Sequence, residues 1–189
     1  KSSLGVAAVL LYTAPAFVML LSIPLFRERL TLRKVMVLAL TVLGCALVSG
    51  VGPGQVESLT PAGLLYGLGS GLGYALYGVI GTFGLRRYSP ETVTAYTFVF
   101  ASVAAVPLAG FQAEDFLAMR QWPVLGSALS IGIVCSMLQF VVYTKGLLRI
   151  APSKASILAS LEPAVAAAVG ILVFHESASL PKVLGMLII

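Results

Sequence analysis

The sequence predicts an all-α integral membrane protein built from inverted five-helix repeats, and three observations lead to this fold class. Hydrophobic residues make up 59% of the 189 residues and charged residues only 10%, whereas a soluble domain typically carries about 25% charged residues. The apolar residues gather in runs of about 20, the length of helix that spans a bilayer. Two segments five helices apart also match each other in sequence. Because lipid offers no hydrogen-bond partners to an exposed backbone, the runs are expected to form helices.

Six apolar runs have the length of a spanning helix, and a seventh begins near Leu180 and stops at Ile189. Ten helical residues cover only ~15 Å, about half of a bilayer. About six and a half transmembrane helices are therefore expected in this chain. The six complete runs are residues 3–26, 33–51, 61–84, 92–111, 123–148 and 153–174.

Positive charge alternates between the predicted loops. Nine of the twelve Lys and Arg residues lie in alternate loops, near residues 27–34, 86–91 and 145–154. By the positive-inside rule, these three loops are expected to face the cytoplasm. The net charge of +5 is thus a feature of topology rather than a basic patch, and it does not predict nucleic-acid binding. The two cysteines have no partners at metal-ligand spacing, so no metal site is expected.

An internal repeat relates residues 10–35 to residues 158–183 at an offset of 148 residues, the separation of Pro15 and Pro163. Five helices separate equivalent points, and an odd number of helices inverts the orientation of the second copy. Inverted repeats with a site near the midplane are typical of secondary transporters. Without a gap, the offset matches Pro15 with Pro163, Glu28 with Glu176, and Lys34 with Lys182.

The repeat divides the chain into three expected parts. Residues 1–51 form the C-terminal part of the first repeat, with two helices. Residues 52–60 form an extracytoplasmic linker, and residues 61–189 form the second repeat, with five helices of which the last is truncated. By the same offset, about three helices are expected upstream, which gives ten helices in the full-length protein.

The chain resembles the EamA-type members of the drug/metabolite transporter superfamily over nearly its whole length. The resemblance is carried by "APAFVMLLSIPLFRERLTLRKV" in the first copy and by "LEPAVAAAVGILVFHESASLPKVLG" in the second. It implies ten helices in two inverted halves, a place in the bacterial inner membrane, and carriage of small metabolites, often amino acids moved outward. One departure is that the family's usual "GE" reads Arg27–Glu28 and His175–Glu176 here, which puts any role of the glycine in doubt.

One carboxylate, Glu162, lies within an apolar run beside Pro163. At ~100° per residue, large apolar side chains occupy one arc of this helix, and Glu162 falls at the edge of the opposite arc of small and polar residues. An intramembrane carboxylate is a functional candidate by default. Pro163 also frees a backbone carbonyl near Ala159. We expect Glu162 to bind a cationic group of a substrate or a proton; the alternative is a structural hydrogen bond to a neighbouring helix.

Polar side chains of three other runs are candidates for the same cavity. Some form a stripe along run 123–148. Others lie just before the proline of the first copy, and the rest are tyrosines of run 61–84. The alternative for each is a hydrogen bond or a packing contact between helices. The candidate substrate-binding residues are Glu162, Pro163, Gln139, Tyr143, Tyr12, Thr13, Tyr74 and Tyr77.

Glycines recur four residues apart at Gly63, Gly67 and Gly71. Small residues at this spacing let two helices approach closely in a membrane. The G-x-G-x-x-G spacing of a dinucleotide-binding loop fails at Leu72, and no strand precedes the segment. We therefore predict close helix packing here rather than a nucleotide site.

Glu28 and Glu176 end matching helices at opposite membrane faces. We expect their carboxylates to bind the N-terminal amides of the following helix, which would rigidify or gate each side. The alternative is that both residues act only as interfacial anchors.

These features predict a secondary transporter, not an enzyme, that moves a small polar metabolite by alternating access, with export of an amino acid or a related compound as the favoured activity. A drug or cation efflux carrier of the same fold is one alternative, and a helical scaffold that transports nothing is another. An intramembrane hydrolase is disfavoured because no histidine is available to activate Ser70. The expected partners are a small-molecule substrate and the lipid bilayer, with protons as the candidate coupling ion and a homodimer left open. No cofactor is expected.

Overall fold

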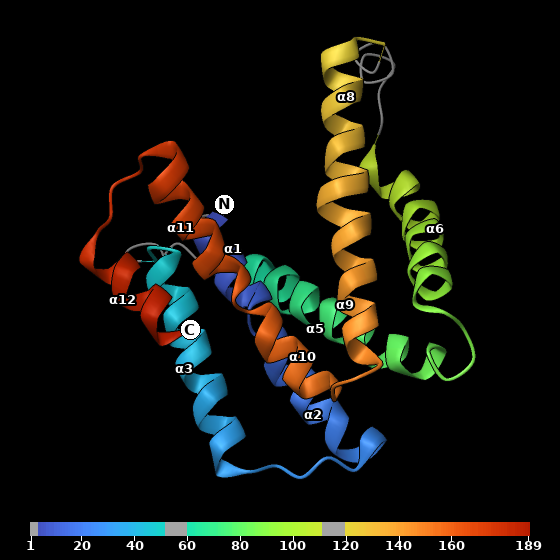
Figure 1. Ribbon diagram of the computed structural model, residues 1–189, viewed down its shortest axis with the longest axis horizontal. Coiled ribbons are helices and arrows are strands. Elements are labelled where there is room, and N and C mark those ends of the chain that lie inside the picture. Colours follow the sequence, from blue (N-terminus) through green and yellow to red (C-terminus); the bar gives the residue numbers. More distant parts are fainter. Residues whose placement is uncertain (1–3, 52–59, 111–119) are drawn as a thin grey trace. The chain divides into compact units, whose positions relative to one another are not determined.

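The computed structural model describes residues 4–51, 60–110 and 120–189, and within these ranges all regular secondary structure is helical (Figure 1). The chain forms two compact units, each described here by itself. Unit 1 comprises residues 1–80 and 150–189, and unit 2 comprises residues 81–149. Of the predicted linker 52–60, residues 52–59 lie outside the described residues.

Unit 1 combines parts of both predicted repeats. Two of its apolar runs are each divided into two helices by a short break, and the others are continuous. Helix α5 continues into the first residues of unit 2. The helices are α1 (Leu4–Leu11), α2 (Ala14–Phe26), α3 (Leu32–Val48), α5 (Pro61–Gly84), α10 (Pro152–Ala159), α11 (Glu162–Phe174) and α12 (Leu180–Ile188).

Glycines bring the helices of unit 1 close together at two contacts. In the contact between α3 and α12, a Cβ built on Gly185 would lie 2.7 Å from the carbonyl oxygen of Gly44. In the contact between α1 and α5, a Cβ on Gly67 would lie 2.5 Å from Leu10 Cδ1, and one on Gly71 would lie 3.1 Å from the Leu10 carbonyl oxygen. The close packing predicted for Gly67 and Gly71 is thus confirmed.

The apolar core of unit 1 lies between α2 and α5, where Val18, Ala75 and Val79 are almost completely buried. Partly buried side chains pack around them: Phe17, Leu21 and Phe26. Helix α10 also packs against α2. The core therefore fixes α2 relative to the two helices that flank it.

The predicted division of run 153–174 into two arcs is confirmed in part, because Glu162 and Ala166 of the small and polar arc are exposed. The large side chains of Leu158, Val165 and Leu172 are exposed, as side chains that face lipid should be. Small residues of the opposite arc, including Ser156 and Ala167, are buried. The arcs therefore separate a surface for lipid from a surface for neighbouring helices.

Unit 2 pairs two helical rods, which are α6 (Pro90–Ala109) and the rod formed by α8 (Trp122–Ser130), η1 (Ile131–Leu138) and α9 (Gln139–Leu147). The η1 segment is a π-helix, so the rod is not α-helical throughout. Thr94 of α6 donates a buried hydrogen bond of 3.2 Å to the Thr144 hydroxyl of α9. The rings of Phe98 and Phe140 pack edge to face with centroids 5.4 Å apart.

The predicted runs correspond to helices throughout the described part of the chain. Of the six runs predicted to span a membrane, four form helical segments in that part that are long and apolar enough to do so; α3, with 17 residues, and α6 are not among them. The prediction was wrong about continuity, because runs 3–26 and 153–174 were each expected to form a single helix. The first is divided between Leu11 and Ala14. In the second, residues 155–170 were expected to be continuous. The structure divides this run between Ala159 and Glu162, since the Pro163 ring has no N–H to bond the carbonyl one turn earlier. The four segments are Ala7–Phe26, Pro61–Gly84, Trp122–Leu147 and Pro152–Phe174.

The two copies of the repeat share their backbone geometry as well as their sequence. Helices α2 and α11 begin and end at positions that differ by the same offset of 148 residues. Each ends at a left-handed residue, Arg27 with φ 54° and His175 with φ 55°. Glycine reaches this conformation without steric cost, which explains why a glycine is usual at this position. In Figure 1 the chain runs downward along α1–α2 and upward along α10–α11.

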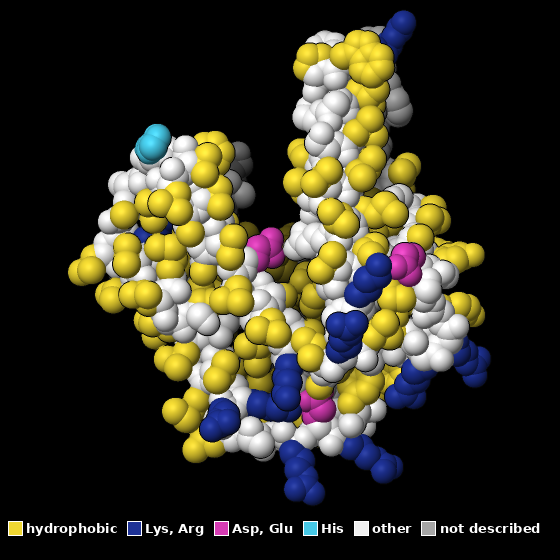
Figure 2. Space-filling model, viewed as in Figure 1, with side chains coloured by type: hydrophobic (Ala, Val, Ile, Leu, Met, Phe, Trp, Pro, Cys, Tyr) yellow, Lys and Arg dark blue, Asp and Glu magenta, His cyan; other side chains and the backbone are white. Residues whose placement is uncertain are grey.

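Hydrophobic side chains cover most of the surface visible in Figure 2. Large exposed residues include Leu20, Leu40 and Leu65. Around the connection from α2 to α3, positively charged side chains stand out instead (Figure 2), and Arg27, Arg29 and Arg33 are all exposed there. This distribution fits apolar rods within lipid and a charged connection at its surface.

Candidate functional site

A small pocket of about 30 Å³ lies in unit 1 where the two interrupted helices meet. Both breaks contribute to its wall, and α5 supplies one further residue. Three repeat-matched pairs line it at the 148-residue offset: Leu11 with Ala159, Tyr12 with Ser160, and Ala14 with Glu162. The remaining lining residues are Pro15, Tyr74 and Ser156.

The first break separates α1 from α2 and follows from Pro15. This proline occupies the first turn of α2 and has no N–H to continue the ladder of α1. The chain instead closes with a tighter bond of 3.2 Å from Thr13 N to the Leu10 carbonyl. The Thr13 hydroxyl donates to the same carbonyl at 2.6 Å. Thr13 therefore stabilises the break through both its backbone N–H and its hydroxyl, which donate to the Leu10 carbonyl.

The second break has the same form. Ser160 N donates to the Ile157 carbonyl at 3.1 Å and Leu161 N to the Leu158 carbonyl at 3.2 Å, both three residues back. Helix α11 then begins at Glu162, with Pro163 in its first turn. A proline in the first turn of the following helix thus ends both α1 and α10.

The breaks bring helix ends of both polarities to one pocket. The C-terminal ends of α1 and α10 present partly negative carbonyls, and the N-terminal ends of α2 and α11 present partly positive N–H groups. Neither Thr13 nor Leu161, the residues before the two N-terminal ends, places a side-chain cap on these amides. Discontinuous helices use such ends to bind charged groups within membranes.

Polar side chains add to the helix ends. Glu162 supplies a carboxylate and interacts electrostatically with both Tyr12 and Tyr74. Ser156 is 1% exposed, and its Oγ has no hydrogen-bond partner in the described part of the chain. Ser160 Oγ donates to the Ser156 carbonyl at 3.2 Å. The pocket thus offers one negative charge, two phenols and a buried hydroxyl that is still available to a ligand.

The structure brings three of the eight predicted substrate-binding residues into this pocket: Glu162, Tyr12 and Tyr74. Thr13 and Pro163 lie next to lining residues and shape the breaks. Tyr77 lies on α5 but does not line the pocket, and the last two predicted residues, Gln139 and Tyr143, belong to α9 in unit 2. The substrate-binding role of all eight stays a prediction.

Sequence reasoning did not single out Ser156 and Ser160 as pocket residues. Both belong to the small and polar arc of run 153–174, one helical turn apart, and they precede Glu162 by six and two residues. Their spacing of four residues, on the arc that carries the carboxylate, was a signal that could have found them.

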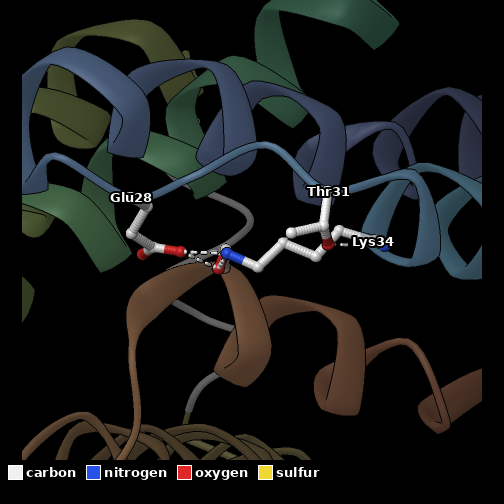
Figure 3. A network of polar contacts seen from close by, with 4 residues as sticks. Glu28, Thr31 and Lys34 are labelled. Carbon is white, nitrogen blue, oxygen red and sulfur yellow. Dashed lines mark hydrogen bonds and ion pairs between the residues drawn. The ribbon is translucent and has the colours of Figure 1, made fainter.

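A second polar cluster surrounds Glu28, in the connection between α2 and α3 (Figure 3). Lys34, in the first turn of α3, donates from Nζ to Glu28 Oε2 at 2.7 Å. Ser153, in the first turn of α10, donates its hydroxyl to the same oxygen. Burial alone would raise the pKa of Glu28, but the hydrogen bonds from Lys34 and Ser153 and the charge of Lys34 hold this pKa below 4.5.

The matching cluster around Glu176 is simpler. Lys182, in the first turn of α12, donates from Nζ to Glu176 Oε2 at 2.6 Å. The two glutamates therefore contact a lysine side chain of the following helix, where the sequence predicted contacts with that helix's N-terminal amides. Glu28 does interact with a backbone N–H, but this N–H belongs to Ser153 of α10. The gating role of both glutamates stays a prediction.

Comparison of the sequence with known protein families assigns the chain to one of them. The model of the EamA-like transporter family matches residues 1–50 and 61–189, nearly the whole chain. The chain belongs to the EamA-like transporter family. As a family member whose helices are long and apolar enough to span a bilayer, it is a multi-pass membrane protein.

Similar proteins occur in an archaeon and in bacteria. An uncharacterized transporter of Archaeoglobus fulgidus is 30% identical over 190 residues, which cover 98% of this chain and 64% of the relative. The threonine/homoserine exporter RhtA of Escherichia coli strain K12 is 29% identical over 174 residues, 92% of this chain and 56% of the relative. The uncharacterized transporter YxxF of Bacillus subtilis is 27% identical over 167 residues, 88% of this chain and 52% of the relative. The chain therefore spans between about half and two thirds of the length of these curated relatives.

Proposed function

We propose that the full-length protein is a secondary transporter that moves a small zwitterionic metabolite, an amino acid or a close relative, across the membrane by alternating access. One observation carries the proposal: the two proline breaks of the inverted repeat meet at one pocket, beside the carboxylate of Glu162. A scaffold would gain nothing from a carboxylate at an interrupted helix within lipid, because both features cost free energy there. Similarity to a threonine/homoserine exporter supports an amino acid as the cargo and export as the direction.

A zwitterion fits the charges of the pocket. Its ammonium group would bind the Glu162 carboxylate and the Ala159 carbonyl, which Pro163 leaves without its helical N–H partner, since charge-assisted hydrogen bonds are the strongest available there. Its carboxylate would lie at the N-terminal ends of α2 and α11, where the helix dipole favours an anion. The Ser156 hydroxyl would donate a further hydrogen bond. Such a ligand would pair every charge that the pocket takes out of water.

The inverted repeat supplies the mechanism for alternating access. The two interrupted helices run in opposite directions (Figure 1), so rocking one copy against the other would open the pocket to each side of the membrane in turn. The repeat division at residues 52–60 is part of this proposal, as is a bacterial inner membrane with the loops near 27–34, 86–91 and 145–154 in the cytoplasm. A proton bound by Glu162 in exchange for the substrate ammonium would couple transport to the proton gradient.

The test uses the full-length protein in proteoliposomes that contain a pH-sensitive dye. Threonine and homoserine are compared with a matched amine that lacks the carboxylate and a matched hydroxy acid that lacks the ammonium. We expect proton flux with the two amino acids alone, lost in Glu162→Gln and kept in Glu91→Gln, whose exposed carboxylate pairs with Lys145 in unit 2.

Other results separate the alternatives. Flux driven by the amine alone, with none from the amino acids, would identify a cation efflux carrier, which the tyrosines beside Glu162 keep as the second candidate. Absence of flux with every compound would favour a scaffold. Equal flux in the wild type and Glu162→Gln would show that this carboxylate has a structural role.

A further inference from the structure

We propose that Glu28 and Ser153 form a latch that joins the α2–α3 connection to the start of α10, positions the pocket-lining face of α10, and keeps the pocket closed on the side of that connection. The latch rests on the proposed alternating access but on no particular substrate. Its members come from three segments that are far apart in sequence. No part of the argument depends on unit 2.

The contacts of the latch converge on one oxygen. Ser153 Oγ and Lys34 Nζ both donate to Glu28 Oε2, and Lys34 Nζ also lies 3.4 Å from Ser153 Oγ (Figure 3). The side chains of Glu28 and Lys34 are 12% and 22% exposed, and Ser153 is 1% exposed. An ion pair this far removed from water is screened less than a surface pair. Because the pKa of Glu28 is lowered, the carboxylate is charged at neutral pH.

The latch acts on the helix that lines the pocket. Helix α10 has only eight residues and runs from the latch at its start to the break at its end. Ser153 holds the first turn, and Ser156, which lines the pocket, lies three residues later, ~4.5 Å along the axis. Helix α10 is thus a short rod fixed at both ends. Release of the latch would free its start while the break supplies a hinge at its end.

Among the described residues, the matching cluster in the second copy shows no counterpart of the bond from Ser153 to Glu28. The residue that matches Ser153 at the repeat offset is Gly5, which has no hydroxyl to donate. The side chain of Glu176 is 55% exposed, and its Oε2 lies 2.8 Å from where a Cβ on Gly170 would stand. Gly170 matches Ser22, which is fully buried. Glu176 therefore packs on the end of its own helix and bonds to Lys182.

This difference between the copies makes the pocket harder to open on the Glu28 side of the membrane than on the Glu176 side. On the Glu28 side, opening must break a partly buried hydrogen bond to a charged group, as well as move the ion pair. On the Glu176 side, the ion pair lies within one connection and moves as a unit. The resting protein is therefore expected to be closed on the Glu28 side and to open first on the Glu176 side.

The test measures access to the pocket from each side of the membrane, without substrate. In the full-length protein with Cys45 and Cys135 replaced by alanine, Ala159→Cys is labelled by a membrane-impermeant maleimide in right-side-out and in inverted vesicles. We expect Ser153→Ala and Glu28→Gln to raise the labelling rate about tenfold from the Glu28 side, the shift that follows loss of one hydrogen bond to a charged group. Labelling from the opposite side should fall in the same variants.

Controls distinguish the latch from general loosening. Ser153→Thr keeps the hydroxyl and should restore wild-type labelling, while Ser179→Ala, at the start of α12 where the serine makes no side-chain cap bond, should change neither rate. A rise from both sides at once, or unchanged rates in variants that remain folded by thermal unfolding, would overturn the proposal. So would absence of labelling from either side. Because no substrate is present, these results are independent of the transport test with Glu162.

Discussion

The contact between α3 and α12 makes a sharp prediction, because adding a single methyl group at Gly185 should force the two helices apart. A Cβ there would lie 2.7 Å from the Gly44 carbonyl oxygen, 2.8 Å from Val48 Cγ2 and 2.9 Å from Leu47 Cβ. The first of these atoms is backbone and cannot turn away as the end of a side chain can. Carbon-to-oxygen contacts ordinarily begin at ~3.3 Å, so the helices must separate by ~0.6 Å.

The magnitude follows from two opposing effects. Overpacking a close contact typically costs about 1–3 kcal/mol, while alanine in place of glycine stabilises a helix by up to ~1 kcal/mol. Gly69→Ala is the matched control, because Gly69 is helical and exposed, with nothing within 4 Å of its Cβ position. Gly185→Ala should therefore be less stable than Gly69→Ala by about 1–3 kcal/mol, or ~4–8 °C in Tm for a 2 kcal/mol difference.

The assay is thermal unfolding of the full-length protein in detergent, followed by light scattering and by tryptophan fluorescence. Wild type and the two single variants are compared under identical lipid and detergent conditions. Equal unfolding temperatures for Gly185→Ala and Gly69→Ala would refute the reasoning, since the methyl group would then have found space that the close contact denies it.

Three further predictions concern the clusters and breaks. Glu28 has a lowered pKa, so its contribution to stability is present above its unfolded pKa of about 4.3 and is lost as pH falls through the lowered value. Wild type should therefore have a higher Tm than Glu28→Gln at pH 7, and this difference should shrink as the pH falls below the unfolded pKa. Pro163→Ala restores a backbone N–H, and we expect continuous α-helix by hydrogen exchange together with a transport loss of ~10-fold or more. Unchanged exchange near Ala159 would count against the proline as the cause of the break. Arg27→Gly relieves a left-handed residue and should stabilise the protein by up to ~1 kcal/mol in thermal unfolding, whereas a lower Tm would contradict that backbone argument.

Hydropathy and periodicity predict the helical rods because burial in lipid dictates them residue by residue. Run 153–174 shows this for most of its length, since most residues of the large arc are exposed and most of the small arc are buried, with Glu162 and Ala166 as exceptions. The offset that matches Pro15 with Pro163 likewise predicts two equivalent segments, and their helix limits and caps agree. These features depend on local chemistry, which a single sequence contains.

The partners of polar groups were harder to predict, because they depend on which helices meet. Nothing local indicates that Ser153 donates to Glu28 across 125 positions of sequence. The interruption at Ser160 was missed because a proline indicates a lost hydrogen bond but does not decide between a kinked helix and two helices. That the two breaks share one pocket follows only from the packing of α2, α5 and α10 in unit 1.

The most direct test of the central claim is substrate protection of two cysteines placed at repeat-matched positions of the pocket wall. In the full-length protein without its native cysteines, Leu11→Cys and Ala159→Cys are labelled in the presence of increasing threonine or homoserine. If the two breaks form one binding site, both cysteines should be protected with the same half-saturating concentration, while Gly73→Cys, at an open position of α5, should not respond. Protection of neither cysteine, or protection at clearly different concentrations, would contradict a shared pocket at the two helix breaks.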